Sequence, residues 1–251
     1  MAIFDSDGVA IHYEVSGEGQ PIVLVHGFAS SLQENWVQTG WVKRLVSAGR
    51  RVVALDCRGH GKSAKPRYPS AYGSETMAAD VIRLMDDLEI VRADLMGYSM
   101  GGAVALDLIM RHAERFRRVV LGGVGAVSRG ATESSAIADA LSTDKPATIR
   151  DAVARAFRQF AEQRDNDLKA LAAYMRRRRS RPALEALAAI SMPVLVVVGE
   201  KDDIVSRADV LADAIPGARL LTVPVRDHLT VVPDRRYKEA VLRFLAEAPA
   251  E

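Results

Sequence analysis

A serine between glycines is the first group in this chain that could carry out covalent chemistry. It lies in Gly97-Tyr98-Ser99-Met100-Gly101-Gly102, where a short apolar run stops and a helical pattern begins. A G-x-S-x-G turn between a strand and a helix forces its serine into a tight bend, and the small flanking residues let both elements approach closely. Ser99 is therefore predicted to be an exposed nucleophile. The free N–H groups at the start of the following helix would face a developing oxyanion.

A serine hydroxyl is a poor nucleophile at neutral pH and needs a base within hydrogen-bonding reach. The chain has five histidines. His12 belongs to the first predicted hairpin, and His112 lies at the far end of the helix after the serine. His26 and His60 lie inside turn motifs. His228 follows the last predicted strand, so elimination makes it the predicted base; the alternative is an ordinary polar loop histidine.

The elements that would position these residues alternate between strand and helix. A β-hairpin is predicted over residues 3–15, where apolar residues alternate around the turn Asp5-Ser6-Asp7-Gly8. One apolar run ends just before the serine turn. Further apolar runs, typical of strands covered on both faces, occupy residues 22–25, 51–55, 119–121, 193–198 and 220–223. Helical patterns occupy residues 41–48, 77–88 and 236–246. This order predicts an α/β fold with a mainly parallel sheet and helices on both faces.

Between Gly125 and Met192 the pattern changes, because no strand is legible and apolar residues recur at helical spacing. We predict an all-helical insertion over residues 126–191, with residues 1–125 and 192–251 forming the core domain. The insertion would lie over the carboxyl edge of the sheet as a cap, where α/β proteins bind ligands. Extra helices packed away from the site are the alternative, because periodicity does not say what a helix covers.

Several motifs together resemble the α/β-hydrolase superfamily, in particular its serine esterase-like branch with a helical cap. They are His26-Gly27, the turn from Arg58 to Ser63, the turn around Ser99, Gly199-Glu200-Lys201-Asp202 and the late His228. The match spans most of the chain and leaves out only the helical insertion, where such proteins resemble one another least. The resemblance implies the chain order nucleophile, acid, histidine, which here reads Ser99, Asp202 and His228.

Two adjacent carboxylates, Asp202 and Asp203, compete for the role of acidic partner. In the family the third residue after the glycine carries this role, and counting from Gly199 gives Asp202. Some relatives carry the acid after the strand that corresponds to residues 119–121, but Gly122 to Ala131 contains no Asp or Glu. Asp202 is therefore the predicted acid, Asp203 is its competitor, and a solvated loop pair is the alternative without function.

Stabilising a tetrahedral oxyanion requires convergent N–H donors. The serine turn supplies one from Met100, the residue after the nucleophile. By resemblance to the family, the second is the N–H of Phe28, which follows His26-Gly27 at the end of a central strand. Phe28 also offers an apolar wall. The residues expected to bind the substrate are Phe28, Tyr98, Phe157, Phe160 and Tyr174, and the alternative makes the last three part of an internal cap core.

Composition and charge exclude several other classes of protein. The formal net charge of +2 over 251 residues gives no nucleic-acid footprint. No apolar run approaches the ~18 residues that cross a bilayer, and the first residues lack the apolar region of a signal peptide, so a cytoplasmic location is expected. No cofactor is predicted, because Gly122-Gly123-Val124-Gly125 lacks the context of a dinucleotide fingerprint. No spaced cluster of His, Cys and carboxylates predicts a metal.

Three further features, Cys57, the turn from Arg58 to Ser63 and a basic run, are predicted to supply no catalytic group. The single cysteine, Cys57, is expected to be a buried small side chain, and Arg58 and His60 are expected to brace the turn that follows Asp56. The basic run from Arg176 to Arg181 is expected to be mainly solvated, with one or two arginines able to meet an anionic substrate or partner. Asp227 departs from the glycine that commonly precedes the histidine in the family.

These residues predict a serine hydrolase that cleaves small-molecule carboxylic esters through an acyl-enzyme. Serine at position 99 argues against haloalkane dehalogenases and epoxide hydrolases, which the chain otherwise resembles and which use a carboxylate nucleophile. Hydrolysis of amides, thioesters or carbon–carbon bonds, or cofactor-free perhydrolase activity, is the alternative on the same triad. A ligand-sensing binding protein that retains the triad is the alternative outside enzymes.

Overall fold

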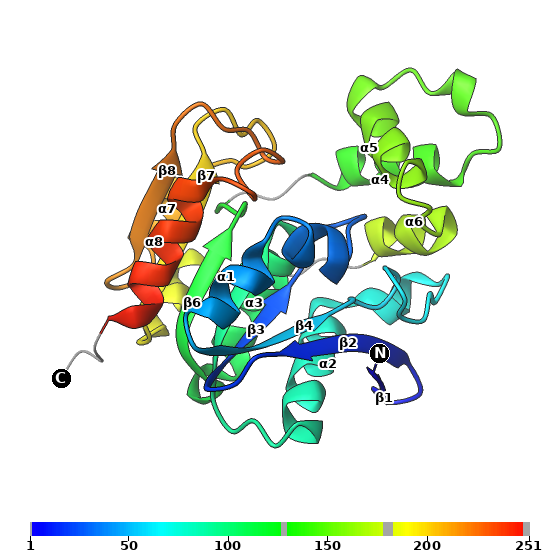
Figure 1. Ribbon diagram of the computed structural model, residues 1–251. Helices are drawn as coiled ribbons and strands as arrows, with labels where there is room; N and C mark the ends of the chain where they lie inside the picture. Colours follow the sequence, from blue (N-terminus) through cyan, green and yellow to red (C-terminus); the bar gives the residue numbers. More distant parts are fainter. Residues whose placement is uncertain (1, 127–129, 178–182, 248–251) are drawn as a thin grey trace.

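One large sheet organises the computed structural model, which describes residues 2–126, 130–177 and 183–247. In this part of the chain the sheet has eight strands in the order β1-β2-β4-β3-β5-β6-β7-β8. The pairs β1–β2 and β2–β4 are antiparallel, and the remaining pairs are parallel. Figure 1 shows the sheet with helices on both faces, which confirms the predicted fold class.

The first two strands form the predicted hairpin at one edge of the sheet. They are β1 (Ala2–Asp5) and β2 (Ala10–Ser16). The Asp5 carboxylate accepts the N–H of Gly8 at 2.6 Å and closes the turn between them. Because β2 also pairs with β4 (Arg50–Leu55), the hairpin extends the parallel part of the sheet.

The central strands are buried on both faces. They comprise β3 (Gln20–Val25), β5 (Ala93–Tyr98), β6 (Phe116–Gly122) and β7 (Val194–Gly199), with β8 (Arg219–Val223) at the far edge. Side chains alternate between the faces, so Ile22 and Leu24 join one hydrophobic cluster while Val23 and Val25 join the other. This double burial explains why the strands are continuous apolar runs in the sequence.

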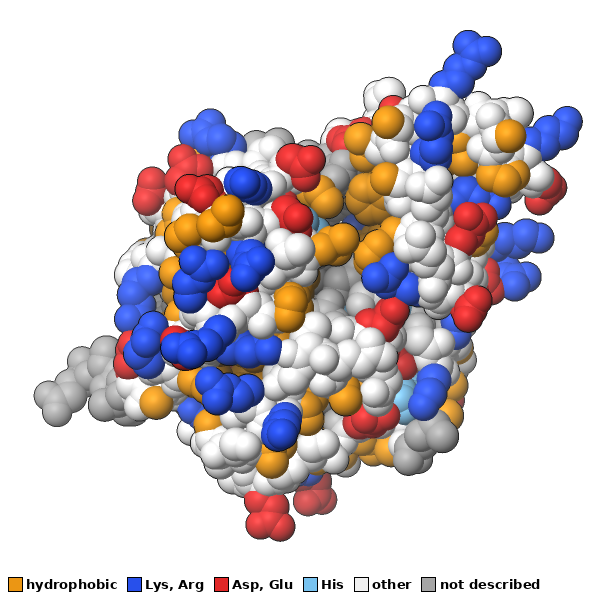
Figure 2. Space-filling view, turned by 45° about the horizontal axis from the view of Figure 1, so that its top comes forward, with side chains coloured by type: hydrophobic (Ala, Val, Ile, Leu, Met, Phe, Trp, Pro, Cys, Tyr) orange, Lys and Arg blue, Asp and Glu red, His pale blue; other side chains and the backbone are white. Residues whose placement is uncertain are grey.

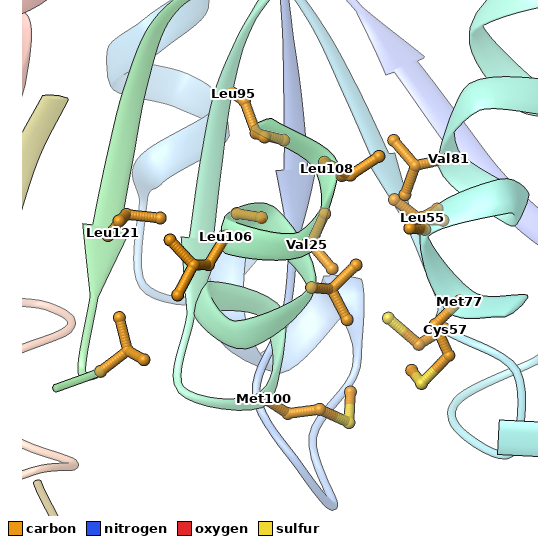
Figure 3. Close-up of a cluster of buried hydrophobic side chains, with 14 of the residues drawn as sticks. Val25, Leu55, Cys57, Met77, Val81, Leu95, Met100, Leu106, Leu108 and Leu121 are labelled. Atoms are coloured by element: carbon orange, nitrogen blue, oxygen red, sulfur yellow. The ribbon is translucent and has the colours of Figure 1, made fainter. Parts of the chain in front are cut away.

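Helices cover each face of the sheet. On one face lie α1 (Trp41–Ser47), α8 (Arg235–Ala246) and a π-helical turn, η1 (Gln33–Val37), around Trp36, Trp41 and Tyr237. On the other lie α2 (Ser74–Asp87), α3 (Met100–Arg111) and α7 (Ala208–Asp213). Figure 3 shows part of this second cluster, including Val81 from α2, Leu108 from α3, and Val25, Leu95 and Leu121 from the strands. Two 3₁₀ turns adjoin these helices: η2 (Pro69–Tyr72) precedes α2, and η3 (Ala113–Arg115) follows α3.

Between β6 and β7 the described residues contain helices and no strand. The helices are α4 (Ala131–Ser142), α5 (Ala152–Glu162) and α6 (Leu168–Arg176), with 3₁₀ turns η4 (Pro146–Thr148) and η5 (Leu184–Ala189). Asp151 and Asp167 cap α5 and α6 by accepting the N–H of the third residue of each helix. Figure 1 shows α4, α5 and α6 grouped together outside the layers that cover the sheet.

The helical character of this segment agrees with the sequence pattern, although its last element, η5, is a 3₁₀ turn. The six-residue helix α7 was not predicted, because so short a segment shows no period. Among the described residues, no helix combines the length and the apolar character needed to span a bilayer.

Candidate active site

Ser99 forms the turn between β5 and α3 in a conformation that few residues other than glycine adopt. Its backbone has φ 54° and ψ −109°. Glycines make the turn possible, because a Cβ on Gly97 would lie 2.1 Å from the carbonyl oxygen of Gly101. A Cβ on Gly101 would lie 2.0 Å from the carbonyl oxygen of Val25. The half-buried serine therefore stands at the carboxyl end of the central strands.

The predicted base reaches this serine from the loop after β8. His228 is 7% exposed, and its Nε2 lies 2.9 Å from Ser99 Oγ. The Tyr98 hydroxyl donates a hydrogen bond to the carbonyl oxygen of His228, and the two rings are 5.3 Å apart. Tyr98 therefore holds the histidine loop against the strand that ends at the serine.

Asp202 occupies the other side of the histidine. His228 Nδ1 donates to Asp202 Oδ2 at 2.7 Å, which leaves Nε2 able to accept a proton from the serine. The second carboxylate oxygen accepts the N–H groups of Ile204 and Val205 at 3.0 and 3.1 Å. Asp203 is exposed. The structure thus brings Asp202, and not its neighbour, into the hydrogen-bonded row with His228 and Ser99.

The loop after β3 brings a second set of backbone groups to the serine. A Cβ on Gly27 would lie 3.6 Å from Ser99 Cβ. The N–H of Gly27 is used within the protein, because it donates to Asn35 Oδ1 at 3.0 Å. The next N–H, that of Phe28, has no acceptor among the described residues. Met100 begins α3 directly after the serine, so its N–H also lacks a helical acceptor.

His26 fixes the peptide group that carries the Phe28 N–H. Its Nε2 accepts the N–H of Cys57 at 3.0 Å, so its proton lies on Nδ1. Nδ1 donates to the carbonyl oxygen of Gly27 at 2.7 Å. Burial lowers the pKa of His26, which keeps the ring neutral in this arrangement.

A buried polar network lies behind this loop and contains Arg58 and His60, which were expected to brace the turn after Asp56. Arg58 donates to both carboxylate oxygens of Asp80, at 2.7 and 2.6 Å. His60 Nδ1 contacts the Arg58 carbonyl, and burial lowers the pKa of His60 to about 3. The Cys57 thiol is buried, which raises its pKa. Among the described residues, no group of three or more His, Cys, Asp and Glu side chains could hold a metal ion.

Asp227 closes a turn that presents His228. Its Oδ1 accepts the N–H groups of Leu229 and Thr230, at 2.9 and 2.8 Å, and the Thr230 hydroxyl. Hydrogen bonds from Thr230 lower the pKa of the Asp227 carboxyl. The aspartate thus supplies local hydrogen bonds at a position where the family commonly has glycine.

A cavity of about 560 Å³ opens beside the serine. Phe28, Tyr98, Phe157, Phe160 and Tyr174, the predicted substrate-binding residues, all line it together with Ser99 and His228. The Phe28 ring stacks on Tyr174 at 5.3 Å and lies 6.0 Å from Phe157. Figure 2 shows hydrophobic side chains gathered around a hollow between the group of α4, α5 and α6 and the rest of the molecule.

Polar residues at one side of this cavity were not predicted from the sequence. Glu34 and Arg164 form an ion pair at 3.1 Å between the segment around η1 and the end of α5. The Arg164 guanidinium lies 3.7 Å from the centre of the Phe160 ring. Burial raises the pKa of Glu34 although Arg164 opposes this shift. No motif marks these residues, because only folding brings the two segments together.

Glycines after β6 also have a role that the sequence did not reveal. A Cβ on Gly123 would lie 2.8 Å from the Tyr98 ring and 3.0 Å from His228 Cε1. The absence of a side chain here therefore makes room for the predicted base and for the tyrosine that holds its loop. In the sequence, only the high density of glycines at residues 122–125 could have indicated this close packing, although these glycines match no cofactor motif.

The structure describes two arginines of the basic run, Arg176 and Arg177. Arg176 pairs with Asp139 at 2.8 Å on the exposed surface. Arg177 lines the cavity, with its guanidinium 3.5 Å from the centre of the Tyr174 ring. Arg178, Arg179 and Arg181 lie outside the described residues.

Comparisons with known proteins give a consistent set of similarities. Residues 20–180 match the model of a family described as the alpha/beta hydrolase fold. The chain is 30% identical to a 2-hydroxymuconate semialdehyde hydrolase of Pseudomonas sp. (strain CF600), over 97% of this chain and 93% of that protein.

Two solved structures are similar in fold over 98% of this chain. A hydrolase from Pseudomonas aeruginosa PA01 superposes with a TM-score of 0.82 at 27% identity, covering 98% of both chains. An enol-lactonase from Burkholderia xenovorans LB400 superposes with a TM-score of 0.76 at 27% identity, covering 98% of this chain and all of that one.

Proposed function

This chain belongs to the alpha/beta hydrolase family, and from that premise we propose that it is a serine hydrolase that cleaves carboxylic esters. One observation carries the proposal: the row of hydrogen bonds from Asp202 through His228 to a strained Ser99, at the edge of a largely apolar cavity. A hydroxyl, an imidazole and a buried carboxylate in this order are the groups that acyl transfer requires.

The distances support an acyl-enzyme route. Ser99 Oγ attacks the ester carbonyl carbon while His228 Nε2 takes its proton, and Asp202 stabilises the imidazolium that forms. The carbonyl oxygen, now an oxyanion, accepts the N–H groups of Met100 and Phe28. Collapse of the tetrahedral intermediate expels the alcohol, which receives the proton from His228. Water then repeats the sequence on the acyl-serine and releases the acid.

Residues 126–191 act in this proposal as a cap over the core formed by residues 1–125 and 192–251. Support comes from the cavity, which is lined by Phe157, Phe160 and Tyr174 from the helical segment and by Ser99 and His228 from the core. The acyl group would contact these aromatic rings, because they supply the large apolar surfaces opposite the serine.

Hydrolysis of carbon–carbon bonds is the second candidate, and two observations favour it. The relative that matches 97% of this chain is a 2-hydroxymuconate semialdehyde hydrolase, whose name denotes an anionic substrate. Arg177 lines the cavity and has no carboxylate partner among the described residues. A cation in this place would suit an acidic substrate.

A substrate panel separates these candidates. We expect p-nitrophenyl esters of increasing chain length to be hydrolysed, with kcat/KM at least ~10-fold above that for 2-hydroxymuconate semialdehyde. Turnover of the semialdehyde without ester hydrolysis would favour the second candidate. Tight binding of either compound without turnover would instead identify a binding protein.

A further inference from the structure

The loop that carries Phe28 is held from the core at two points and contains a strained residue. Asn35 Oδ1 accepts the N–H of Gly27, and Asp56 Oδ1 accepts the N–H of Leu32 at 2.8 Å. Between these points Ala29 is fully buried with φ 54°, a left-handed conformation that is costly for alanine. Such a conformation persists only where surrounding contacts fix it.

A third contact on this loop comes from the helical segment. Asn166, in the turn between α5 and α6, donates from Nδ2 to the carbonyl oxygen of Ala29 at 3.0 Å. The turn holds Asn166 in place, because its backbone N–H bonds the carbonyl oxygen of Ala161 at 3.2 Å. The cap thus contacts the strained residue directly, beside the stacking of Tyr174 on Phe28.

Consecutive peptide groups link this contact to the proposed oxyanion donor. The Ala29–Ser30 peptide group contains the carbonyl that Asn166 binds and the Ser30 N–H, which donates to Gly27 O at 3.3 Å. The Gly27–Phe28 peptide group contains that acceptor carbonyl and the Phe28 N–H. Each hydrogen bond polarises the peptide group it joins and restrains its plane.

We propose that Asn166 is a positioning residue that fixes the Phe28 N–H toward the oxyanion, so that the cap completes the oxyanion hole as well as covering the substrate. This inference rests on the proposed esterase function. His26 holds the Gly27–Phe28 peptide group from the core, and Asn166 acts on it from the cap. Catalysis therefore depends on a cap residue even for esters too small to touch the cap.

The test compares Asn166→Ala with Arg67→Ala. Arg67 binds Asp167, the next residue after Asn166, at 2.7 Å and is 60% exposed, so its removal breaks a neighbouring contact between core and cap without touching the loop of Phe28. For p-nitrophenyl acetate, Asn166→Ala should lower kcat about 10-fold with KM within about 2-fold. This is less than the ~10²–10³ expected when an oxyanion donor itself is removed. Arg67→Ala should leave both constants near those of the wild type.

A second readout separates positioning from general destabilisation. Phenylboronic acid forms a tetrahedral adduct with an active serine, and Asn166→Ala should weaken its inhibition by about the same factor as kcat. Active sites are counted by titration with a fluorophosphonate, so a partly unfolded fraction does not enter kcat. Asn166→Asp, which keeps the size of the side chain but cannot donate, should reproduce the loss if the alanine variant is poorly folded.

Three results would overturn the inference. They are unchanged kcat and boronate inhibition in both Asn166 variants, an equal loss in Arg67→Ala, or a loss confined to KM. Each of these requires an active wild-type esterase, so each leaves the proposed function standing. A wild-type protein that hydrolyses none of the esters would instead reject the proposed function and this inference together.

Discussion

The proposed core and the proposed cap both line the cavity, but they hold their side chains in different ways. In the core, Ser99, Asp202 and His228 follow the ends of parallel strands, and contacts of 2.9 and 2.7 Å join them. In the cap, Phe157 and Phe160 lie on one helix and meet the core through aromatic packing and a half-buried ion pair. In the proposed mechanism, the sheet fixes the reacting groups, whereas the cap offers apolar surface to the substrate.

This difference implies that the two regions affect different kinetic properties. Changes at the ends of the strands should alter the rate for every ester alike, because the reacting groups are common to all substrates. Changes in the cap rings should alter the rate according to the size of the acyl group. Asn166 is the proposed exception, since its side chain donates a hydrogen bond to the loop of Phe28.

Removing the nucleophile should produce the largest effect. Ser99→Ala is expected to lower kcat by ~10⁴-fold or more for every ester, because the deleted hydroxyl forms the acyl-enzyme. Steady-state kinetics checks the loss, and a melting temperature close to that of the wild type shows that the fold is intact. Ser30→Ala, which changes another serine that lines the cavity, is the matched control. Near-wild-type turnover in Ser99→Ala would remove Ser99 from the mechanism.

The two adjacent aspartates should differ strongly. Asp202→Asn is expected to lower kcat by about 10²–10⁴-fold, because an amide favours the wrong tautomer of His228 and does not stabilise the imidazolium. Asp203→Asn should stay within about 2-fold of the wild type, since Asp203 is exposed. Parallel kinetics on both variants makes the comparison. The reverse ranking would move the acidic role to Asp203.

The cap rings should change selectivity more than rate. Phe157→Ala and Phe160→Ala are expected to raise KM several-fold for long-chain esters and to leave the acetyl ester almost unchanged. Val153→Ala, a change on the exposed face of the same helix, is the control. Tyr174 is 5% exposed and packs on Phe28, His60 and Tyr72, so Tyr174→Ala should also cost ~3 kcal/mol of stability. Lost stability with unchanged selectivity in all three variants would make these rings an internal core.

Acid should destabilise the folded protein through buried His60, and this effect is expected to be smaller than the effects of the preceding variants. Burial lowers the pKa of His60 from 6.5 to about 3, so below pH 6.5 the unfolded chain binds a proton that the folded chain does not. Stability from this group is therefore complete above pH 6.5 and falls as the pH drops toward 3, by at most ~1.4 kcal/mol per pH unit. Calorimetry from pH 7 to 5 should give a flatter decline of melting temperature for His60→Gln. Equal slopes would exclude His60 as a source of acid sensitivity.

Most of the core could be predicted from the sequence because local patterns determine it. Apolar runs predict the strands. The glycines around Ser99 are required because a Cβ on Gly97 or Gly101 would lie about 2 Å from a backbone carbonyl oxygen. Elimination among the histidines favoured His228 as the base, and the resemblance to the family favoured Asp202 as the acid. These signals lie within single segments, so one sequence is enough to read them.

The residues of the site that could not be predicted from the sequence depend on contacts between distant segments. Asn35, Asn166 and the pair of Glu34 with Arg164 belong to no motif, and their partners lie in other loops. Helical spacing gave the helices of the insertion but not the residues they contact, because periodicity marks an apolar face without naming its neighbour. The cofactor-free and metal-free character of the reaction stays a prediction from the sequence.

Labelling with a fluorophosphonate tests the central claim most directly. The proposed function predicts a single adduct, located on Ser99 by peptide mass spectrometry and absent from Ser99→Ala. Labelling should slow by ~10²-fold or more in His228→Ala, because the histidine activates the attacking hydroxyl. An adduct on another serine, or a labelling rate that does not depend on His228, would contradict the claim that Ser99, His228 and Asp202 act together.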